Sequence, residues 1–125
     1  PMITNVLTGA KSIGIEYQPI YTKYAQERKQ ELGLDDVVFE NIDARDADFS
    51  RANVFYMFNP FVGDILENVT EKLREEAKKR KIKICTVNME KFHGRNCGHD
   101  NWLTDITPKN NRSWIRIYES TIDQI

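Results

Sequence analysis

The chain has 125 residues, a length that suits one domain with its own core. Its 18 Lys and Arg residues and 19 Asp and Glu residues give a formal net charge of −1. Both signs are interspersed, so a nucleic-acid partner is not expected. No apolar run approaches the roughly 20 residues that cross a bilayer, and no charged-then-apolar leader is present. We therefore expect no membrane partner and a soluble, cytoplasmic protein.

Helices and strands are predicted to alternate along the first half of the chain. Gly9 and Gly33 each follow an apolar helical pattern, and Pro19 suits a first helical position. The predicted elements are the last turns of a helix over 1–9, a strand over Ser12–Glu16, a helix over Pro19–Leu32 and a strand over 37–42.

The second half begins with a strand predicted over Val54–Phe58, whose unbroken apolar run is typical of strands covered on both faces. The aromatic residues of this strand and of the helix before it are expected in the core rather than as a stacking platform; they are Tyr21, Tyr24, Phe55, Tyr56 and Phe58. The remaining predicted elements are an amphipathic helix over 64–79, a strand over 81–88, a polar loop over 89–101 and a strand over 113–120.

This order of elements predicts an α/β domain with a mostly parallel sheet and helices packed on it. Ligands of such sheets bind at the carboxyl ends of the strands. The residues found there are Glu16-Tyr17, Asp43-Ala44, Asn59-Pro60-Phe61 and Asn88. A polar residue at the end of a single strand is explained by turn chemistry. Polar residues at the ends of four strands along one edge of the sheet favour a binding site.

Glu16 carries the most specific expectation. In a mononucleotide-binding half, a carboxylate at the tip of the second strand accepts hydrogen bonds from ribose hydroxyls, about 20 residues beyond a glycine-rich loop. A glycine-rich loop at that distance before Glu16 would lie before Pro1, the first residue of the sequence given. We therefore expect an N-terminally incomplete single domain, 1–125, that lacks the first central strand. The gap would leave the strands at Ser12 and Val54 with unpaired edges.

Three successive segments resemble the motifs of class I, Rossmann-like S-adenosylmethionine-dependent methyltransferases. They are "SIGIEYQPIYTKYAQERKQELGL", "VVFENIDARDADF" and "ANVFYMFNPFVGDILENV". The closing "DNWLTDI" and "SWIRIYES" resemble the region where the family's last strand runs antiparallel. The Ile-Glu strand before a Tyr-Ala helix, and the later strand that ends in Asn-x-Phe, also resemble histone-lysine methyltransferases built on this fold rather than on the SET fold.

The resemblance implies a Rossmann-like sheet with helices on both faces, an antiparallel C-terminal strand and S-adenosylmethionine as the cofactor. It implies that Glu16 binds the ribose, that Tyr17 lies beside the adenine, and that Asp43 accepts a hydrogen bond from the adenine amino group with Ala44 against the ring. The catalytic residues implied are Asn59, Pro60 and Phe61, which would line the place where methyl donor and acceptor meet.

The acceptor is not identified by these motifs; a protein lysine or another nitrogen is the candidate. Relatives that methylate planar nitrogens usually have two prolines in this segment, whereas Pro60 is here followed by Phe61. The glycine-rich loop that would contact the methionine part of the cofactor is absent from the sequence given.

The histidines and cysteines of the 81–101 region invite a zinc interpretation. They are Cys85, His93, Cys97 and His99, and their spacing matches no common structural site, so no metal is predicted. The alternatives for this region are a substrate lid over 89–101 and a cysteine nucleophile paired with His93 or His99. Two cysteines are too few for a disulfide framework, and Cys85 is expected to behave as a small buried hydrophobe.

Two hypotheses compete with the methyltransferase. One is a non-catalytic module that keeps this fold for partner binding, or forms a homo-oligomer by strand exchange through the unpaired edges. The other is a nicotinamide-dinucleotide binder, because Glu16 would serve the ribose of either cofactor. The segment Asn59-Pro60-Phe61 argues against the dinucleotide.

Overall fold

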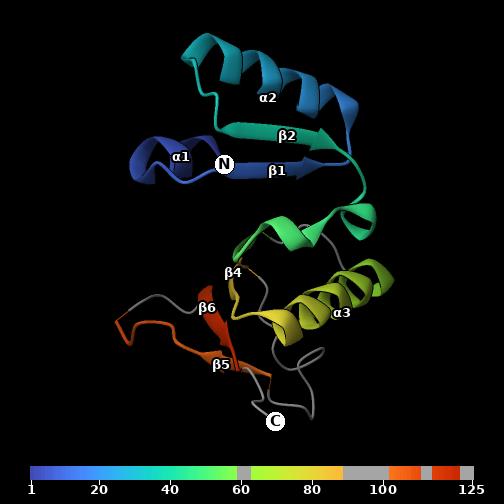
Figure 1. Ribbon diagram of the computed structural model, residues 1–125, viewed down its shortest axis with the longest axis vertical. Helices are drawn as coiled ribbons and strands as arrows, with labels where there is room; N and C mark the ends of the chain where they lie inside the picture. Colours follow the sequence, from blue (N-terminus) through green and yellow to red (C-terminus); the bar gives the residue numbers. More distant parts are fainter. Residues whose placement is uncertain (59–62, 89–101, 111–113, 122–125) are drawn as a thin grey trace. The chain divides into compact units, whose positions relative to one another are not determined.

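The computed structural model describes residues 1–58, 63–88, 102–110 and 114–121 (Figure 1). The chain divides into two compact units, Pro1–Ala47 and Asp48–Ile125. Each unit has a β-sheet of its own among the described residues, and the strands at Ser12 and Val54 are not paired with each other. A gap between these two strands was expected from the sequence.

The 1–47 unit consists of two parallel strands with helices against them. Its elements are α1 (Met2–Thr8), β1 (Ser12–Glu16), α2 (Pro19–Leu32), β2 (Val37–Asn41) and the 3₁₀ helix η1 (Ala44–Asp46). The strands pair in register from Ser12 opposite Val37 to Glu16 opposite Asn41. The predicted helices and strands of this unit are confirmed, except that β2 ends one residue earlier. Gly9 and Gly33 end the helices with φ of 74° and 65°, the left-handed conformation that glycine adopts without strain.

Gly14 lies in the middle of β1, opposite Phe39 of β2. A Cβ atom at position 14 would lie 2.5 Å from Cδ1 and 2.7 Å from Cε1 of Phe39. The glycine therefore provides the space in which the aromatic ring packs over the neighbouring strand.

The variant Gly14→Ala is expected to destabilise the β1–β2 pair by about 1–3 kcal/mol, because the Phe39 ring must move off its present position. Amide hydrogen exchange at Ile42, whose N–H donates to the Glu16 carbonyl at 3.1 Å, measures this opening. The double variant Gly14→Ala/Phe39→Leu should recover part of the lost protection. Unchanged exchange in Gly14→Ala would mean that the ring shifts without cost.

The 48–125 unit has a four-stranded sheet and one long helix among its described residues. Its elements are η2 (Phe49–Arg51), β3 (Val54–Phe58), α3 (Gly63–Lys79), β4 (Lys83–Val87), β5 (Leu103–Asp105) and β6 (Ile115–Ser120). The strand order is β3-β4-β6-β5. β3 and β4 are parallel, while β6 runs antiparallel to both β4 and β5. The expected antiparallel last strand is confirmed, and β5 was not predicted.

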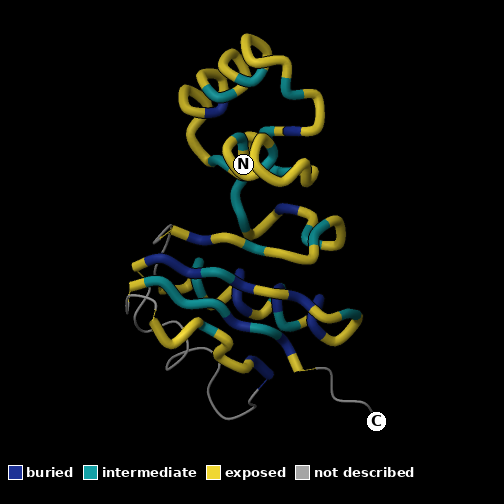
Figure 2. Tube along the Cα trace, turned by 90° about the vertical axis from the view of Figure 1, so that its left-hand side faces the viewer, coloured by how far each residue is buried: buried dark blue, intermediate teal, exposed yellow. Residues whose placement is uncertain are grey.

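The core of this unit lies between α3 and one face of the sheet. The apolar stripe predicted for the helix is buried at Val69, Leu73 and Ala77, and Ile84 and Tyr118 are buried on the strands. Figure 2 shows the buried residues gathered on these elements. No helix in the described ranges is long and apolar enough to cross a membrane.

The opposite face of β3 departs from the sequence prediction. Val54, Tyr56 and Phe58 are 64%, 66% and 58% exposed, whereas Met57 between them is 7% exposed. The prediction that this strand is covered on both faces is therefore wrong for the described residues, and so is the assignment of Tyr56 and Phe58 to the core. Tyr21 and Tyr24 of α2 are also exposed. An apolar run does not itself reveal whether a second layer is present.

Within the described ranges, the sheets also lack the strand pairing of a complete Rossmann-like domain. Two strand pairs are parallel and two are antiparallel in this part of the chain, so the arrangement is mixed rather than mostly parallel. Among the described residues β1 pairs only with β2, and β3 pairs only with β4. β1 and β3 thus each have one edge without a partner strand in this part of the chain.

Candidate functional site

The carboxyl ends of β1 and β2 bring the four predicted cofactor-binding residues into one region of the 1–47 unit. The strands are parallel and end together, at Glu16 and Asn41. Tyr17 directly follows β1, while Asp43 and Ala44 follow β2 at the start of η1. This proximity was expected from the sequence, because the ends of parallel strands meet at one edge of a sheet.

Glu16 holds its carboxylate at the beginning of α2. Oε1 accepts a hydrogen bond of 3.0 Å from the main-chain N–H of Gln18, the residue that precedes Pro19. Within the described ranges, Oε2 of Glu16 has no hydrogen-bond or ion-pair partner. The carboxylate is thus oriented through one oxygen and has the other available as an acceptor.

Asn41 fixes the main chain at the end of β1, and sequence reasoning did not identify it. Its Nδ2 donates to the carbonyl oxygens of Glu16 at 2.9 Å and Tyr17 at 2.8 Å. These bonds cross the strand pair and set the direction in which the chain leaves β1. The register of the strand pair places Asn41, the last residue of β2, opposite Glu16. The Tyr17 side chain beside this clamp is exposed.

Asp43 is bound by Arg45, which was also not identified from the sequence. Oδ1 of Asp43 accepts from the Arg45 main-chain N–H at 2.9 Å and from Nε at 3.0 Å, while Oδ2 accepts from Nη2 at 2.8 Å. The Arg45 hydrogen bonds lower the pKa of Asp43 from 3.8 to about 2. Ala44, the first residue of η1, is half-buried beside this pair.

The Arg45→Gln variant is expected to raise the pKa of Asp43 from about 2 toward its ordinary value of 3.8. The folded-state pKa is depressed, so the pair stabilises the fold above about pH 4, and this contribution is lost as the pH falls through about 2. A carboxyl-carbon NMR titration measures the change. Asp48 is the internal control, because its pKa is lowered mainly by Ser50 and should not respond. An unchanged Asp43 pKa would contradict the assigned cause.

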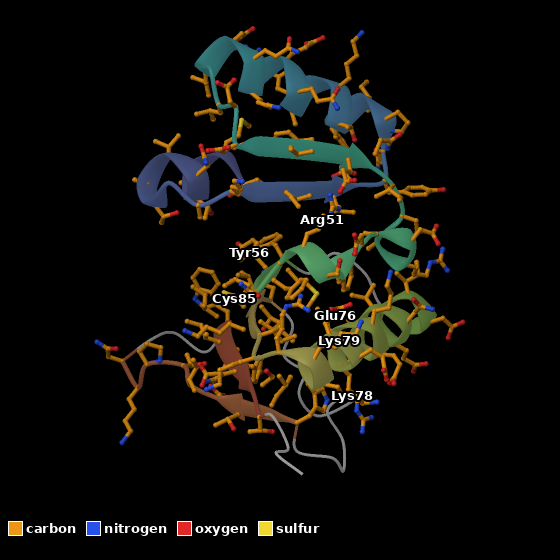
Figure 3. The ribbon with its side chains drawn as sticks, viewed as in Figure 1. Arg51, Tyr56, Glu76, Lys78, Lys79 and Cys85 are labelled. Atoms are coloured by element: carbon orange, nitrogen blue, oxygen red, sulfur yellow. The ribbon has the colours of Figure 1, made fainter. Side chains whose placement is uncertain are left out.

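The predicted catalytic residues Asn59, Pro60 and Phe61 lie outside the described residues, as do His93, Cys97 and His99 of the 89–101 loop. No group of three His, Cys, Asp or Glu side chains in the described ranges is placed to hold a metal ion. Cys85 is half-buried on β4 (Figure 3), and burial raises the pKa of its thiol. A raised pKa keeps the thiol protonated, as expected of a packing residue rather than a nucleophile.

Comparison with solved structures relates this fold to a known one. A crystal structure of a "putative methylase" from Haemophilus influenzae aligns with a TM-score of 0.62 and 14% sequence identity, over 95% of this chain and 78% of that chain. The chain has a methylase-like fold. No protein-family model matches the sequence, and neither does any curated protein.

Proposed function

We propose that the chain is an S-adenosylmethionine-dependent methyltransferase domain whose nucleoside subsite lies at the carboxyl ends of β1 and β2. The observation that carries the proposal is the Glu16 carboxylate, oriented by Gln18 through Oε1 and with Oε2 unpartnered in the described ranges. The methylase-like fold supports it. In this proposal Glu16 accepts hydrogen bonds from the ribose hydroxyls, Tyr17 and Ala44 lie against the adenine, and Asp43 accepts from its amino group.

Methyl transfer requires little chemical participation by the protein's side chains. When bound, S-adenosylmethionine would supply a methyl group on a sulfonium, which would pass to a nucleophilic atom of the acceptor while the carbon–sulfur electrons return to sulfur and S-adenosylhomocysteine is released. A proton that the acceptor must lose passes to solvent. The protein's contribution is alignment in a site that excludes water. We assign that alignment to Asn59, Pro60 and Phe61, with a protein lysine or another nitrogen as the candidate acceptor.

The ribose role is tested by titrating the chain with adenosine and with 2′-deoxyadenosine, followed by amide NMR shifts. Adenosine should bind on the order of tenfold more tightly, because the deoxy compound leaves a charged acceptor with fewer partners. Glu16→Gln should remove most of this preference. Asp36→Asn is the matched control, since Asp36 directly precedes β2 at the opposite end of the same strand pair.

A calorimetric titration with S-adenosylhomocysteine extends the test to the whole product. Saturable binding that weakens in Glu16→Gln and in Asp43→Ala, but not in Asp36→Asn, is the expected result. Equal affinity for the two nucleosides, or full-strength binding in both site variants, would remove Glu16 and Asp43 from the cofactor site.

A second candidate function, a non-catalytic module that forms a homo-oligomer by strand pairing, is favoured by β3. This strand pairs with β4 without interruption, and its other edge has no partner strand among the described residues. Val54–Phe58 contains no charge and no proline, the features by which natural proteins usually protect an open edge. Two copies related by a two-fold axis would pair β3 antiparallel to itself about Tyr56, whose exposed side chain is labelled in Figure 3.

Light scattering across a concentration series tests this candidate. A dimer that Tyr56→Lys converts to monomer would support β3 pairing, because a charged side chain on each copy would meet its equivalent. Thr104→Lys places the same charge on an exposed position of β5 and should leave the dimer intact. A monomer at every concentration, or a dimer insensitive to Tyr56→Lys, would refute it.

A further inference from the structure

The Asp43 carboxylate accepts more hydrogen bonds than the cap of a short turn requires. The main-chain N–H of Arg45 already caps η1 through Oδ1. The Arg45 guanidinium then adds Nε to Oδ1 and Nη2 to Oδ2, at 3.0 and 2.8 Å. Both oxygens are therefore fixed by a planar fork, the geometry in which arginine surpasses lysine.

The Arg45 fork leaves part of the Asp43 carboxylate without a donor. A carboxylate offers about four lone-pair positions, two on each oxygen. Oδ1 of Asp43 uses two of them on Arg45, and Oδ2 uses one. Within the described residues, the side-chain carboxylate of Asp43 has no further hydrogen-bond or ion-pair partner. One acceptor position, on Oδ2, is left for a ligand.

We propose that Arg45 is a positioning residue that fixes Asp43 so that Oδ2 accepts one hydrogen bond from the exocyclic amino group of a purine. The inference rests on the proposed nucleoside subsite and assigns its base selectivity. An ionised carboxylate can only accept, so a base with an amino group at this position is bound and one with a carbonyl oxygen is repelled. Arg45 itself does not touch the base; it acts by restricting the rotation of the Asp43 side chain.

Arg45 can be changed without removing the local turn. The main-chain hydrogen bonds from Arg45 to Oδ1 and from Asp46 to the Asp43 carbonyl do not depend on the residue-45 side chain. Arg45→Gln removes both the fork and the charge, whereas Arg45→Lys restores the charge without the fork. Selectivity and the Asp43 pKa should therefore respond differently to the two variants.

The test compares dissociation constants for adenosine, which carries the amino group, and inosine, which carries a carbonyl oxygen in its place. The wild-type chain should bind adenosine on the order of tenfold more tightly than inosine. The Asp43 carboxylate is paired with the amino group in the adenosine complex, whereas it faces the carbonyl oxygen in the inosine complex. In Arg45→Gln the preference should fall to about threefold or less. Arg45→Lys should keep the pKa of Asp43 closer to wild type than Arg45→Gln does, yet recover little of the preference.

Arg51→Gln is the matched control, because Arg51 lies near Asp48 with Nε 3.7 Å from Oδ2 and should not affect the base preference. If wild type prefers adenosine and Arg45→Gln keeps the full preference, the positioning role is overturned while the nucleoside subsite stands. Full recovery in Arg45→Lys would also overturn it, since charge alone would suffice. If wild type binds neither nucleoside, the proposed function fails together with this inference.

Discussion

Replacing Arg80 with alanine is expected to lower the free energy of unfolding of the 48–125 unit by about 3 kcal/mol. Arg80 follows α3 and ties three segments together. Its guanidinium donates to the carbonyl oxygens of Phe49 and Ala52, to Oδ1 of Asn53, and to the carboxylate of Glu76. It thereby fixes η2 and the start of β3 against the end of the helix.

The size of the effect follows from what the variant leaves behind. Glu76 is buried, and its hydrogen bond with Arg80 is the main reason that the pKa of its carboxyl is lowered. Without Arg80, the one partner left to this carboxylate among the described residues is Lys79, at 3.4 Å. The Phe49 carbonyl oxygen also loses its donor. Leaving buried groups of this kind unpaired lowers the free energy of unfolding by more than the net contribution of the hydrogen bonds that they formed.

Urea unfolding followed by tryptophan fluorescence measures this loss, because the two tryptophans, Trp102 and Trp114, both belong to the 48–125 unit. Lys78→Ala is the matched control. Lys78 pairs with Glu75 at 2.7 Å on an exposed face of the same helix, where such pairs contribute at most about 0.5 kcal/mol. Glu76, Lys78 and Lys79 are labelled in Figure 3. Equal stability of the Arg80 and Lys78 variants would contradict the structural role of Arg80.

Leu73→Ala is expected to have a similar or larger effect, about 2–5 kcal/mol, on the same unfolding transition. Leu73 is 1% exposed at the centre of the apolar stripe of α3, so the variant opens a cavity against the sheet. The same measurement applies. The lost burial would lower the unfolding midpoint without altering the shape of the curve if the unit still unfolds cooperatively.

Val54→Ala supplies a control in the same unit, because it truncates an aliphatic side chain that is 64% exposed on β3. Its effect is expected within about 0.5 kcal/mol, the usual range for surface substitutions. Comparable losses in the Leu73 and Val54 variants would mean that burial of Leu73 on α3 does not carry the core of the 48–125 unit.

The sequence predicted the local elements closely where chain chemistry is decisive. Pro19 and Gly33 mark the ends of α2, and the helix runs over Pro19–Leu32 as expected. The β1 strand and the strand over Val54–Phe58 were also correct in their bounds. β5, in contrast, is a three-residue strand, Leu103–Asp105, and too short for alternation to distinguish it from a loop.

The residues of the candidate site were predictable in part. Strand ends follow from apolar runs, so Glu16, Tyr17, Asp43 and Ala44 could be placed at one edge. Asn41 and Arg45 could not, because their roles depend on side-chain hydrogen bonds across the strand pair and within a turn. Polar residues beside a strand end look alike in sequence whether they clamp the main chain or face solvent.

By itself, the sequence determined where the chain forms its helices and its strands of five or six residues, because periodicity, proline and glycine act within a few residues. Tertiary structure alone decided the strand order β3-β4-β6-β5 and the exposure of one face of β3. It also decided that Arg45 holds Asp43 and that Arg80 joins three segments. The strand order and the exposed face depend on strand partners, and the Arg80 bonds depend on carbonyl groups distant in the sequence. The Arg45 bonds depend on side-chain conformation within a turn, and none of these features leaves a periodic signal in the residues concerned.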